Sequence, residues 1–206
     1  MARAHPVHSP YTPLLVTRAC HRLIACDRLL ERCHGRPDND PLSDYLALPE
    51  DDPWTYEMIR GELYMSPQAR FIHQRVQARL VRLLDEYVER QDLGSIVEPT
   101  NLYLDEVNYV QPDISYFTKA QSEALIDEVA VRLVPLLVVE LLSSGTAEKD
   151  RGTKLRWYTD LGVREYWLVG ICRCAVEVIQ LRTGTGQQSD PVRSAVLAGL
   201  ALPLAR

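Results

Sequence analysis

The chain has 206 residues, of which 46% are hydrophobic and 25% charged, a composition that allows one α/β domain with a core of useful size and a short appendage. No apolar run approaches the roughly 18–20 residues of a membrane-spanning helix, so we expect no membrane partner. The formal net charge of −5 excludes a protein that is basic as a whole, and any contact surface for nucleic acid must therefore be local.

Residues 1–41 differ in composition from the rest of the chain. They are rich in arginine, carry the pattern of one amphipathic helix around residues 14–33, and end in the breaker-rich stretch HGRPDNDP. They lack the continuous apolar segment and small-residue cleavage site of a secretory signal. The five cysteines, an odd number, favour reduced thiols. We therefore predict a cytoplasmic protein with an N-terminal extension, 1–41, and a single domain, 42–206.

The first elements of the domain alternate between helix and hairpin. Residues 42–53 have the pattern of a short helix stopped by prolines. Residues 54–67 alternate apolar and polar side chains around Gly61, which predicts a β-hairpin. In residues 71–91 apolar side chains recur at intervals of three and four, with charges between them, which predicts an amphipathic helix that Gly94 ends.

Strands dominate the second half of the domain. The run 134–143 is nearly continuous in apolar residues, as in a central strand buried on both faces. A second helix is expected over 146–162, closed by Gly162, and the final segment 194–206 is expected to pack as a lid or an edge element. The other expected strands cover 95–104, 110–117, 164–170 and 174–182. From residue 72 onward the order is helix, three strands, helix, strand, an αβββαβ framework.

Two carboxylates in these strands carry the first chemical signal. Asp113 follows a proline inside a short strand, and Glu140 interrupts the apolar run of the central strand. A buried carboxylate is costly unless it is paired or binds a cation. Two carboxylates on neighbouring strands repel each other, and a divalent ion relieves that repulsion. Oxygen ligands of this kind suit Mg²⁺ or Mn²⁺.

Three polar residues on the second helix carry the second signal. Asp150, Lys154 and Tyr158 are spaced four apart and share one helix face. If that face packs beside Glu140, Lys154 is placed to stabilise charge on a phosphate or to orient an attacking water. Structural interpretations stay open: a Pro-Asp pair in a turn, a glutamate at a solvated strand end, and a surface ion pair on the helix.

From about residue 42 to the C-terminus the chain resembles the Uma-two family, a branch of the PD-(D/E)xK nuclease superfamily. The resemblance implies an α/β fold of the restriction-endonuclease type, with an αβββαβ core and a mixed central sheet flanked by helices. It also implies a metal-dependent endonuclease that hydrolyses DNA with metal-activated water and needs no organic cofactor. The stretches that carry the resemblance are YEMIRGELYMSP, HQRV, VQPDISYF, LLVVELLS, the D-x3-K-x3-Y face of DRGTKLRWY, GVREYWLV and SAVLAGLAL.

The resemblance assigns roles to individual residues. Asp113 and Glu140 match the two metal-binding carboxylates, while the usual position of the lysine, two residues after the second acid, is Leu142. The lysine then comes from the following helix, as Lys154. Glu62 matches a further acid that is expected to assist at the metal. His73 also matches a polar position of the family, and the residue is expected either to contact a phosphate or to cap its helix.

The sequence also supports a competing interpretation, a non-catalytic binding or assembly module that keeps the nuclease fold. The acidic net charge favours it, as does Gly170, where the family commonly has aspartate. No segment is recognisable as a base-recognition element, so the sequence does not indicate a target site. Arg151 and Arg156 offer a local basic contact to DNA or a solvated helix face. A homodimer would bring two centres to the two strands of a duplex, although no segment specifies one.

Overall fold

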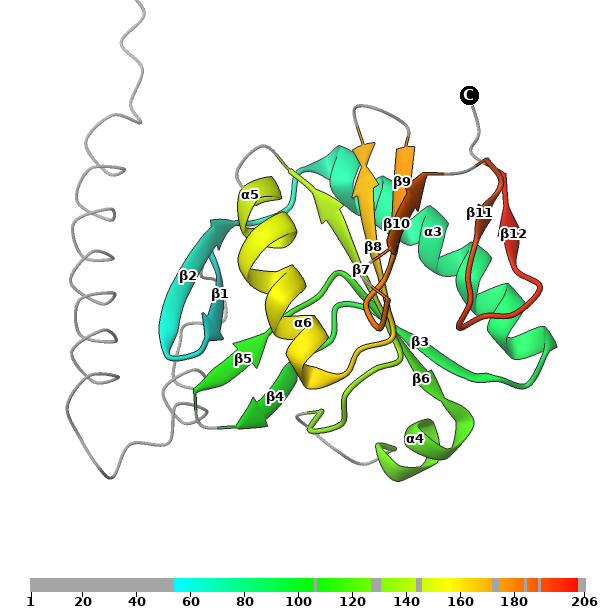
Figure 1. Cartoon of the computed structure of the whole chain (residues 1–206), viewed down its shortest axis with the longest axis horizontal. Coiled ribbons are helices and arrows are strands. Elements are labelled where there is room, and N and C mark those ends of the chain that lie inside the picture. Colours follow the sequence, from blue (N-terminus) through cyan, green and yellow to red (C-terminus); the bar gives the residue numbers. More distant parts are fainter. Residues whose placement is uncertain are drawn as a thin grey trace, which may run out of the picture. The chain divides into compact units, whose positions relative to one another are not determined.

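The computed structural model of the chain describes residues 54–105, 107–126, 131–143, 146–171, 175–183, 185–188 and 190–203 (Figure 1). The N-terminal extension, the helix expected at 42–53 and the five cysteines lie outside the described residues. No helix in the described part is long and apolar enough to cross a membrane.

A six-stranded mixed sheet forms the centre of the described domain, in the order β10-β9-β8-β7-β6-β3. Neighbouring strands are antiparallel except for β7 and β8, which are parallel. In chain order, α3, β3, β6, β7, α6 and β8 reproduce the expected αβββαβ core. The strands of this sheet are β3 (Gly94–Val97), β6 (Ile114–Thr118), β7 (Leu137–Leu142), β8 (Glu165–Gly170), β9 (Ala175–Gln180) and β10 (Thr185–Gln188).

The predicted N-terminal hairpin is confirmed and belongs to a second sheet. Arg60 and Gly61 form its two-residue turn, both with positive φ, and the strands pair without a break. This turn geometry matches the twist of the flanking strands. The second sheet has the order β2-β1-β5-β4, formed by β1 (Trp54–Ile59), β2 (Glu62–Pro67), β4 (Leu102–Asp105) and β5 (Asn108–Val110).

Two runs that the alternation pattern predicts as single strands are each divided, and those predictions are wrong in detail. The run 95–104 becomes β3 and β4, because Pro99 lacks the N–H that a ladder needs. The run 110–117 becomes the end of β5 and most of β6. Asp113 therefore lies in a bend directly before β6 and not inside a strand.

The long helix α3 (Phe71–Arg90) is confirmed, but Gly94 does not end it. The helix ends at Arg90 with Gln91 as its C-cap residue, and Asp92 takes the left-handed conformation, with φ of 51°. Gly94 instead begins β3 with φ of 139°, where its α-carbon passes close to the backbone of β6. A side chain at this position would collide with a carbonyl oxygen.

The second helix contains a wide turn that the sequence pattern does not predict. It runs as α5 (Ala147–Lys149), the π-helical turn η1 (Asp150–Lys154) and α6 (Leu155–Leu161). Gly162 closes it in the left-handed conformation, with φ of 89°, as expected. A short helix, α4 (Lys119–Ala124), follows β6 and was not predicted.

The two faces of the six-stranded sheet bury separate apolar cores. Residues on one face of each strand pack against α3, and those on the other face pack against α6, so the two helices lie on opposite sides (Figure 1). The final segment supplies β11 (Val192–Arg193) and β12 (Ala201–Leu202), and its Leu197 and Leu200 are buried in the core on the α3 side. It therefore forms a small two-stranded sheet of its own and contributes side chains to the core. Glu140 alternates with Val139 and Leu141, which face α3, and so points toward α6.

Candidate active site

Two adjacent strands bring Asp113 and Glu140 together. In the antiparallel pair β6–β7, Ile114 lies opposite Val139, so the next position outward sets Asp113 opposite Glu140. The Asp113 Oδ2 atom accepts a hydrogen bond of 2.7 Å from the backbone N–H of Leu141. This bond ties the Asp113 side chain to the strand that carries Glu140. The sheet therefore supplies the paired carboxylates that the sequence predicts.

Lys154 reaches the same place from η1. Its side chain is only 4% exposed, and its Nζ atom lies 2.8 Å from Glu140 Oε1, 2.8 Å from Glu57 Oε1 and 3.7 Å from Asp150 Oδ1. The ammonium group is thus enclosed by carboxylates and does not point to solvent. The surface ion-pair interpretation of Asp150 and Lys154 is wrong, because both side chains are buried.

The π turn is the local device that presents these groups. Asp150 and Lys154 are its first and last residues, and both are buried although the turn is polar. One wide turn inside a helix is a known feature of functional sites, since it redirects side chains that a regular helix would spread out. Tyr158 follows one turn later, and its hydroxyl donates a 3.1 Å hydrogen bond to Glu140 Oε1.

Glu57 and Lys149 belong to this cluster and were not predicted. Lys149 Nζ lies 2.6 Å from Glu57 Oε2, so the Glu57 carboxylate bridges two lysines. One signal was available: in β1, Glu57 is two residues from Ile59 and shares its buried face. An acid on the apolar face of a strand requires a partner, although the sequence does not say which.

Burial and neighbouring charges set the protonation of the cluster in opposite directions. Burial raises the pKa of Glu140 well above its ordinary value, Lys154 opposes this, and Asp150, Asp113 and Glu57 add to the rise. Burial also raises the pKa of Asp150, with Lys154 again opposing. For Lys154, burial lowers the pKa, but the surrounding carboxylates outweigh it, and the net pKa is well above the ordinary value. The lysine therefore stays protonated at neutral pH.

Two buried tyrosines form the apolar wall of the cluster. The rings of Tyr158 and Tyr166 lie 5.2 Å apart, and the Tyr166 hydroxyl donates a 3.2 Å hydrogen bond to the backbone oxygen of Asp150. Burial raises the pKa of both phenols well above the ordinary value, and the Glu140 carboxylate adds to this rise. Tyr158 therefore stays protonated and acts as a hydrogen-bond donor to Glu140.

His73 lies against Asp113 from the first turn of α3. Its Nε2 atom is 3.4 Å from Asp113 Oδ2, and the hydrogen bond to Asp113 raises the pKa of the imidazole while partial burial lowers it. The helix has Arg70 as its N-cap residue and no side-chain cap, so His73 does not cap it. Its Nδ1 atom is buried without a hydrogen-bond partner in the described part of the chain.

Glu62 and the two helix arginines lie away from the buried cluster. Glu62 is exposed on β2 and accepts a 2.7 Å hydrogen bond from the Tyr64 hydroxyl, so Glu57 and not Glu62 is the hairpin acid that contacts Lys154. Arg151 pairs with Glu177 at 2.6 Å, and Arg156 is exposed. A metal contact by Glu62 and a DNA contact by the arginines stay predictions.

The carboxylates fit a hard divalent cation in their chemistry. Across the described residues, no three His, Cys, Asp or Glu side chains are arranged as a complete ligand set. Mg²⁺ commonly takes only one or two protein carboxylates and completes its shell with water and substrate phosphate. Asp113 and Glu140 supply such a pair. Asp150 Oδ1 is buried without a hydrogen-bond partner in the described structure, with Lys154 Nζ 3.7 Å away.

The αβββαβ core, with Glu140 in β7 and Asp113 directly before the neighbouring strand β6, defines a protein of the restriction-endonuclease fold class. A family model described as "putative restriction endonuclease", Uma2, matches residues 42–205. The chain therefore belongs to the Uma2 family. A solved structure from Anabaena variabilis, described as a putative nuclease of DUF820, is similar, with a TM-score of 0.64 and 19% identity over 79% of this chain and 94% of that one. No curated protein matches the chain.

Proposed function

We propose that this protein is a divalent-metal-dependent endonuclease that hydrolyses phosphodiester bonds of DNA. The observation that carries the proposal is the buried Lys154 ammonium beside Glu140, on the strand next to Asp113. Family membership supports nuclease chemistry. Burying charged groups carries a large desolvation cost, so this buried cluster is weak evidence for a purely stabilising role.

Asp113 and Glu140 would hold the ion, Mg²⁺ or Mn²⁺. When bound, such an ion supplies an activated water and neutralises charge on the scissile phosphate. Lys154 then donates to a non-bridging phosphate oxygen, where negative charge increases as the water oxygen bonds to phosphorus and the sugar oxygen leaves. Glu57 also holds the lysine, at the same distance as Glu140, and Tyr158 orients the Glu140 carboxylate.

The competing proposal is a binding or assembly module without turnover. One observation favours it: Lys154 is already engaged by both Glu57 and Glu140 at 2.8 Å, so substrate must compete with two short contacts. A module of this kind would keep metal affinity at Asp113 and Glu140 and cut nothing.

A nicking assay separates the two proposals. Supercoiled plasmid is incubated with the wild-type protein, with Asp113→Asn and with Lys154→Met, in Mg²⁺, in Mn²⁺ and in EDTA. Under the endonuclease proposal the wild type nicks only with metal, and each variant is slower by at least about a hundredfold. Linear product formed before the nicked form accumulates would indicate two cooperating centres, as in a homodimer.

Matched controls come from an exposed ion pair on the same chain. Asp92 and Lys119 contact each other at 2.5 Å at the surface, so Asp92→Asn and Lys119→Met make the same chemical changes outside the cluster. Both should nick at the wild-type rate. If all five proteins give the same trace, the cleavage is contamination. If none cuts duplex, single-stranded or branched substrates while the wild type still binds Mn²⁺, the module proposal is the better one.

A further inference from the structure

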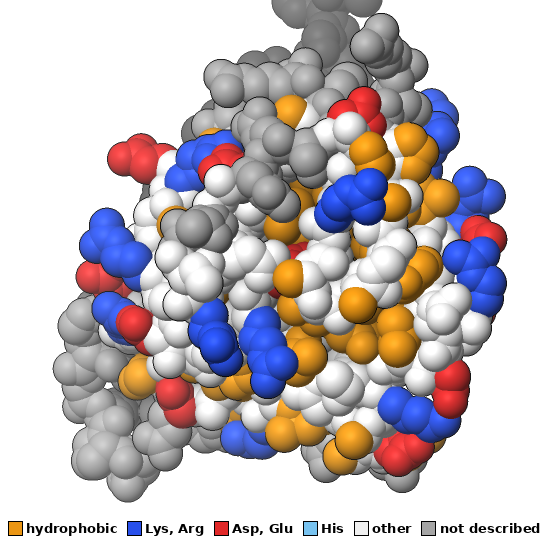
Figure 2. Space-filling model, turned by 45° about the vertical axis from the view of Figure 1, so that its right-hand side comes forward, with side chains coloured by type: hydrophobic (Ala, Val, Ile, Leu, Met, Phe, Trp, Pro, Cys, Tyr) orange, Lys and Arg blue, Asp and Glu red, His pale blue; other side chains and the backbone are white. Residues whose placement is uncertain are grey.

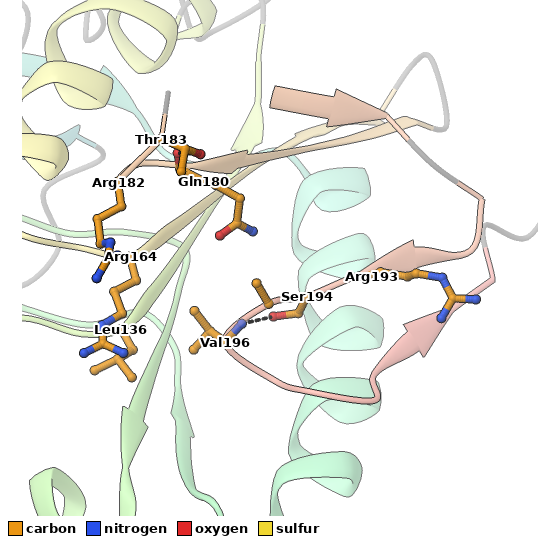
Figure 3. A pocket seen from close by; sticks show the side chains of 9 residues that line it. Leu136, Arg164, Gln180, Arg182, Thr183, Arg193, Ser194 and Val196 are labelled. Atoms are coloured by element: carbon orange, nitrogen blue, oxygen red, sulfur yellow. Dashed lines mark hydrogen bonds between the residues drawn. The ribbon is translucent and has the colours of Figure 1, made fainter. Parts of the chain in front are cut away.

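A second polar site lies at the opposite end of β7 and β8 from Glu140. Leu136 directly precedes β7 and Arg164 directly precedes β8, and both line a pocket of about 560 Å³ (Figure 3). Leu136 is separated from Glu140 by about 13 Å of extended strand. The pocket therefore contains none of the cluster around Lys154. Its other lining residues are Gln180, Arg182, Thr183, Arg193, Ser194, Ala195 and Val196.

The charge of this pocket is opposite in sign to that of the whole protein. The lining includes three arginines and neither aspartate nor glutamate, whereas the chain carries a net charge of −5. In the described part of the chain, Arg164, Arg182 and Arg193 form no ion pair, in contrast to Arg151 with Glu177. This pocket is thus a local basic surface on a protein with a negative net charge.

Two of the arginines are adjacent and the third is peripheral. Figure 3 shows Arg164 and Arg182 beside each other at one side of the pocket, while the guanidinium of Arg193 points away beyond Ser194. Figure 2 shows the face that carries β11 and β12, where basic side chains border an apolar area and acidic ones lie mostly toward the edges. Two guanidinium groups at one side of a pocket carry like charges, which favours an anionic occupant over a cationic one.

The backbone beneath the two arginines is held firmly. The Arg164 N–H donates to the Leu136 oxygen at 3.1 Å, and the Arg164 oxygen accepts from the Leu181 N–H at 3.0 Å. Glu165, fully buried, accepts 2.7 Å hydrogen bonds from the Trp167 indole and from the Ala195 N–H, which fixes the loop opposite. The lining is therefore largely preformed, which lowers the entropy cost of binding.

A serine in that loop adds a directed donor. Ser194 Oγ accepts hydrogen bonds from the N–H groups of Val196 at 3.1 Å and Leu197 at 2.8 Å. With its lone pairs used in this way, the hydroxyl proton is left to donate. A planar guanidinium pair plus a hydroxyl matches the tetrahedral oxygens of a phosphate, which arginine binds in bidentate fashion.

We propose that this pocket binds a phosphate group through Arg164 and Arg182, with Ser194 as an additional donor. The phosphate belongs either to a nucleic-acid backbone or to a free nucleotide, and a pocket of about 560 Å³ lies within the usual 300–1,000 Å³ range of small-ligand sites. The site stands apart from the proposed nuclease centre. Its occupant can be tested without cleavage.

Binding is measured in EDTA, so that no metal-dependent cleavage takes place, with two probes: AMP by calorimetry and a fluorescein-labelled 16-base-pair duplex by anisotropy. The variant is Arg164→Gln/Arg182→Gln. The control is Arg79→Gln/Arg82→Gln, which removes two exposed α3 arginines that do not line the pocket. We expect the pocket variant to weaken binding at least about tenfold and the control variant to match the wild type.

The two probes identify the source of the phosphate. If only the duplex responds, the slope of log K against log salt should fall by about 0.9, because one phosphate is no longer neutralised by the arginine pair. If AMP binds to the wild type and not to the pocket variant, the ligand is a free nucleotide. Equal affinities of wild type and pocket variant for both probes, or no wild-type binding of either at millimolar concentration, overturn the proposal.

Discussion

Replacing Lys154 by methionine tests whether the lysine is the charge that makes a buried Glu140 tolerable. Methionine has nearly the same length and no charge. In the variant Glu57 keeps Lys149 at 2.6 Å, so Glu140 is the carboxylate left without a cation. Removing one partner of a buried ion pair costs about 3–5 kcal/mol, because the remaining charge is uncompensated.

The pH dependence of this cost can be worked out from Glu140. The folded variant can avoid a buried charge only by keeping Glu140 protonated. In the unfolded chain the same carboxyl group has a pKa near 4.5 and has released its proton at neutral pH. At about 1.4 kcal/mol per pH unit, the cost is about 3 kcal/mol at pH 7 and below about 1 kcal/mol at pH 5. The folded variant then binds more protons than the unfolded chain between these pH values, so its stability falls as pH rises.

Urea unfolding followed by tryptophan fluorescence measures the effect, since Trp157 and Trp167 are buried in the domain. Wild type, Lys154→Met and the surface control Lys119→Met are compared at pH 5, 6 and 7. We expect the unfolding free energy of Lys154→Met to fall by about 1.4 kcal/mol per pH unit between pH 5 and 7, and the control to follow the wild type. The gap to the wild type should widen only above the raised pKa at which Glu140 ionises in the wild type. A Lys154→Met stability that is the same at pH 5 and 7 would refute the reasoning.

Two further substitutions test parts of the structure that the sequence did not predict. Glu57→Gln removes the charge that two lysines share. Burial raises the pKa of Glu57, but the two lysines outweigh burial and hold the pKa below 4.5. We therefore expect Glu57→Gln to be less stable than the wild type by about 2–3 kcal/mol at neutral pH. This difference should shrink as the pH falls below 4.5, because the wild-type carboxylate then becomes protonated. Equal deficits at pH 4 and pH 7 would contradict this role. Gly94→Ala places a Cβ against the Phe117 oxygen, well inside van der Waals distance, at φ of 139° and should lower unfolding stability by more than about 2 kcal/mol in the same urea titration. Gly152→Ala, with open space around the new methyl group, is its control and should be neutral or stabilising.

The elements that the sequence predicted are those whose signal is local. The hairpin 54–67, the helix α3 and the central strand β7 each show their own periodicity, and the structure contains all three. The strand boundaries were less accurate, since the alternation continues through Pro99 and Pro112 although the backbone there leaves the ladder. Alternation records which face a residue occupies and not whether its N–H is bonded.

The candidate site was predictable only in part, because its hairpin side joins segments that are distant in the sequence. Asp113, Glu140 and Lys154 could be proposed from neighbouring strands and one helix face. Lys149 and Glu57 are 92 positions apart and meet only because the hairpin sheet packs against the π turn. The turn itself has no periodic signature, since Asp150 and Lys154 have the spacing of an ordinary helix face. Contacts between the hairpin sheet and the helix depend on the tertiary fold and leave no local pattern in the sequence.

The lysine beside Glu140 comes from the helix and not from the strand that carries the acid. The usual lysine position, two residues after Glu140, is Leu142, which packs with the apolar core on the α6 side of the sheet. The same side of β7 carries Glu140, so a helix crossing that face can deliver an ammonium group to the acid from outside the strand. Lys154 does so from the π turn, and Glu57 holds it there. In this chain the positive charge beside Glu140 thus comes from the helix and not from the strand. A motif that requires the lysine two residues after the acid would therefore miss this chain. Its lysine, Lys154, nevertheless contacts the same acid, Glu140.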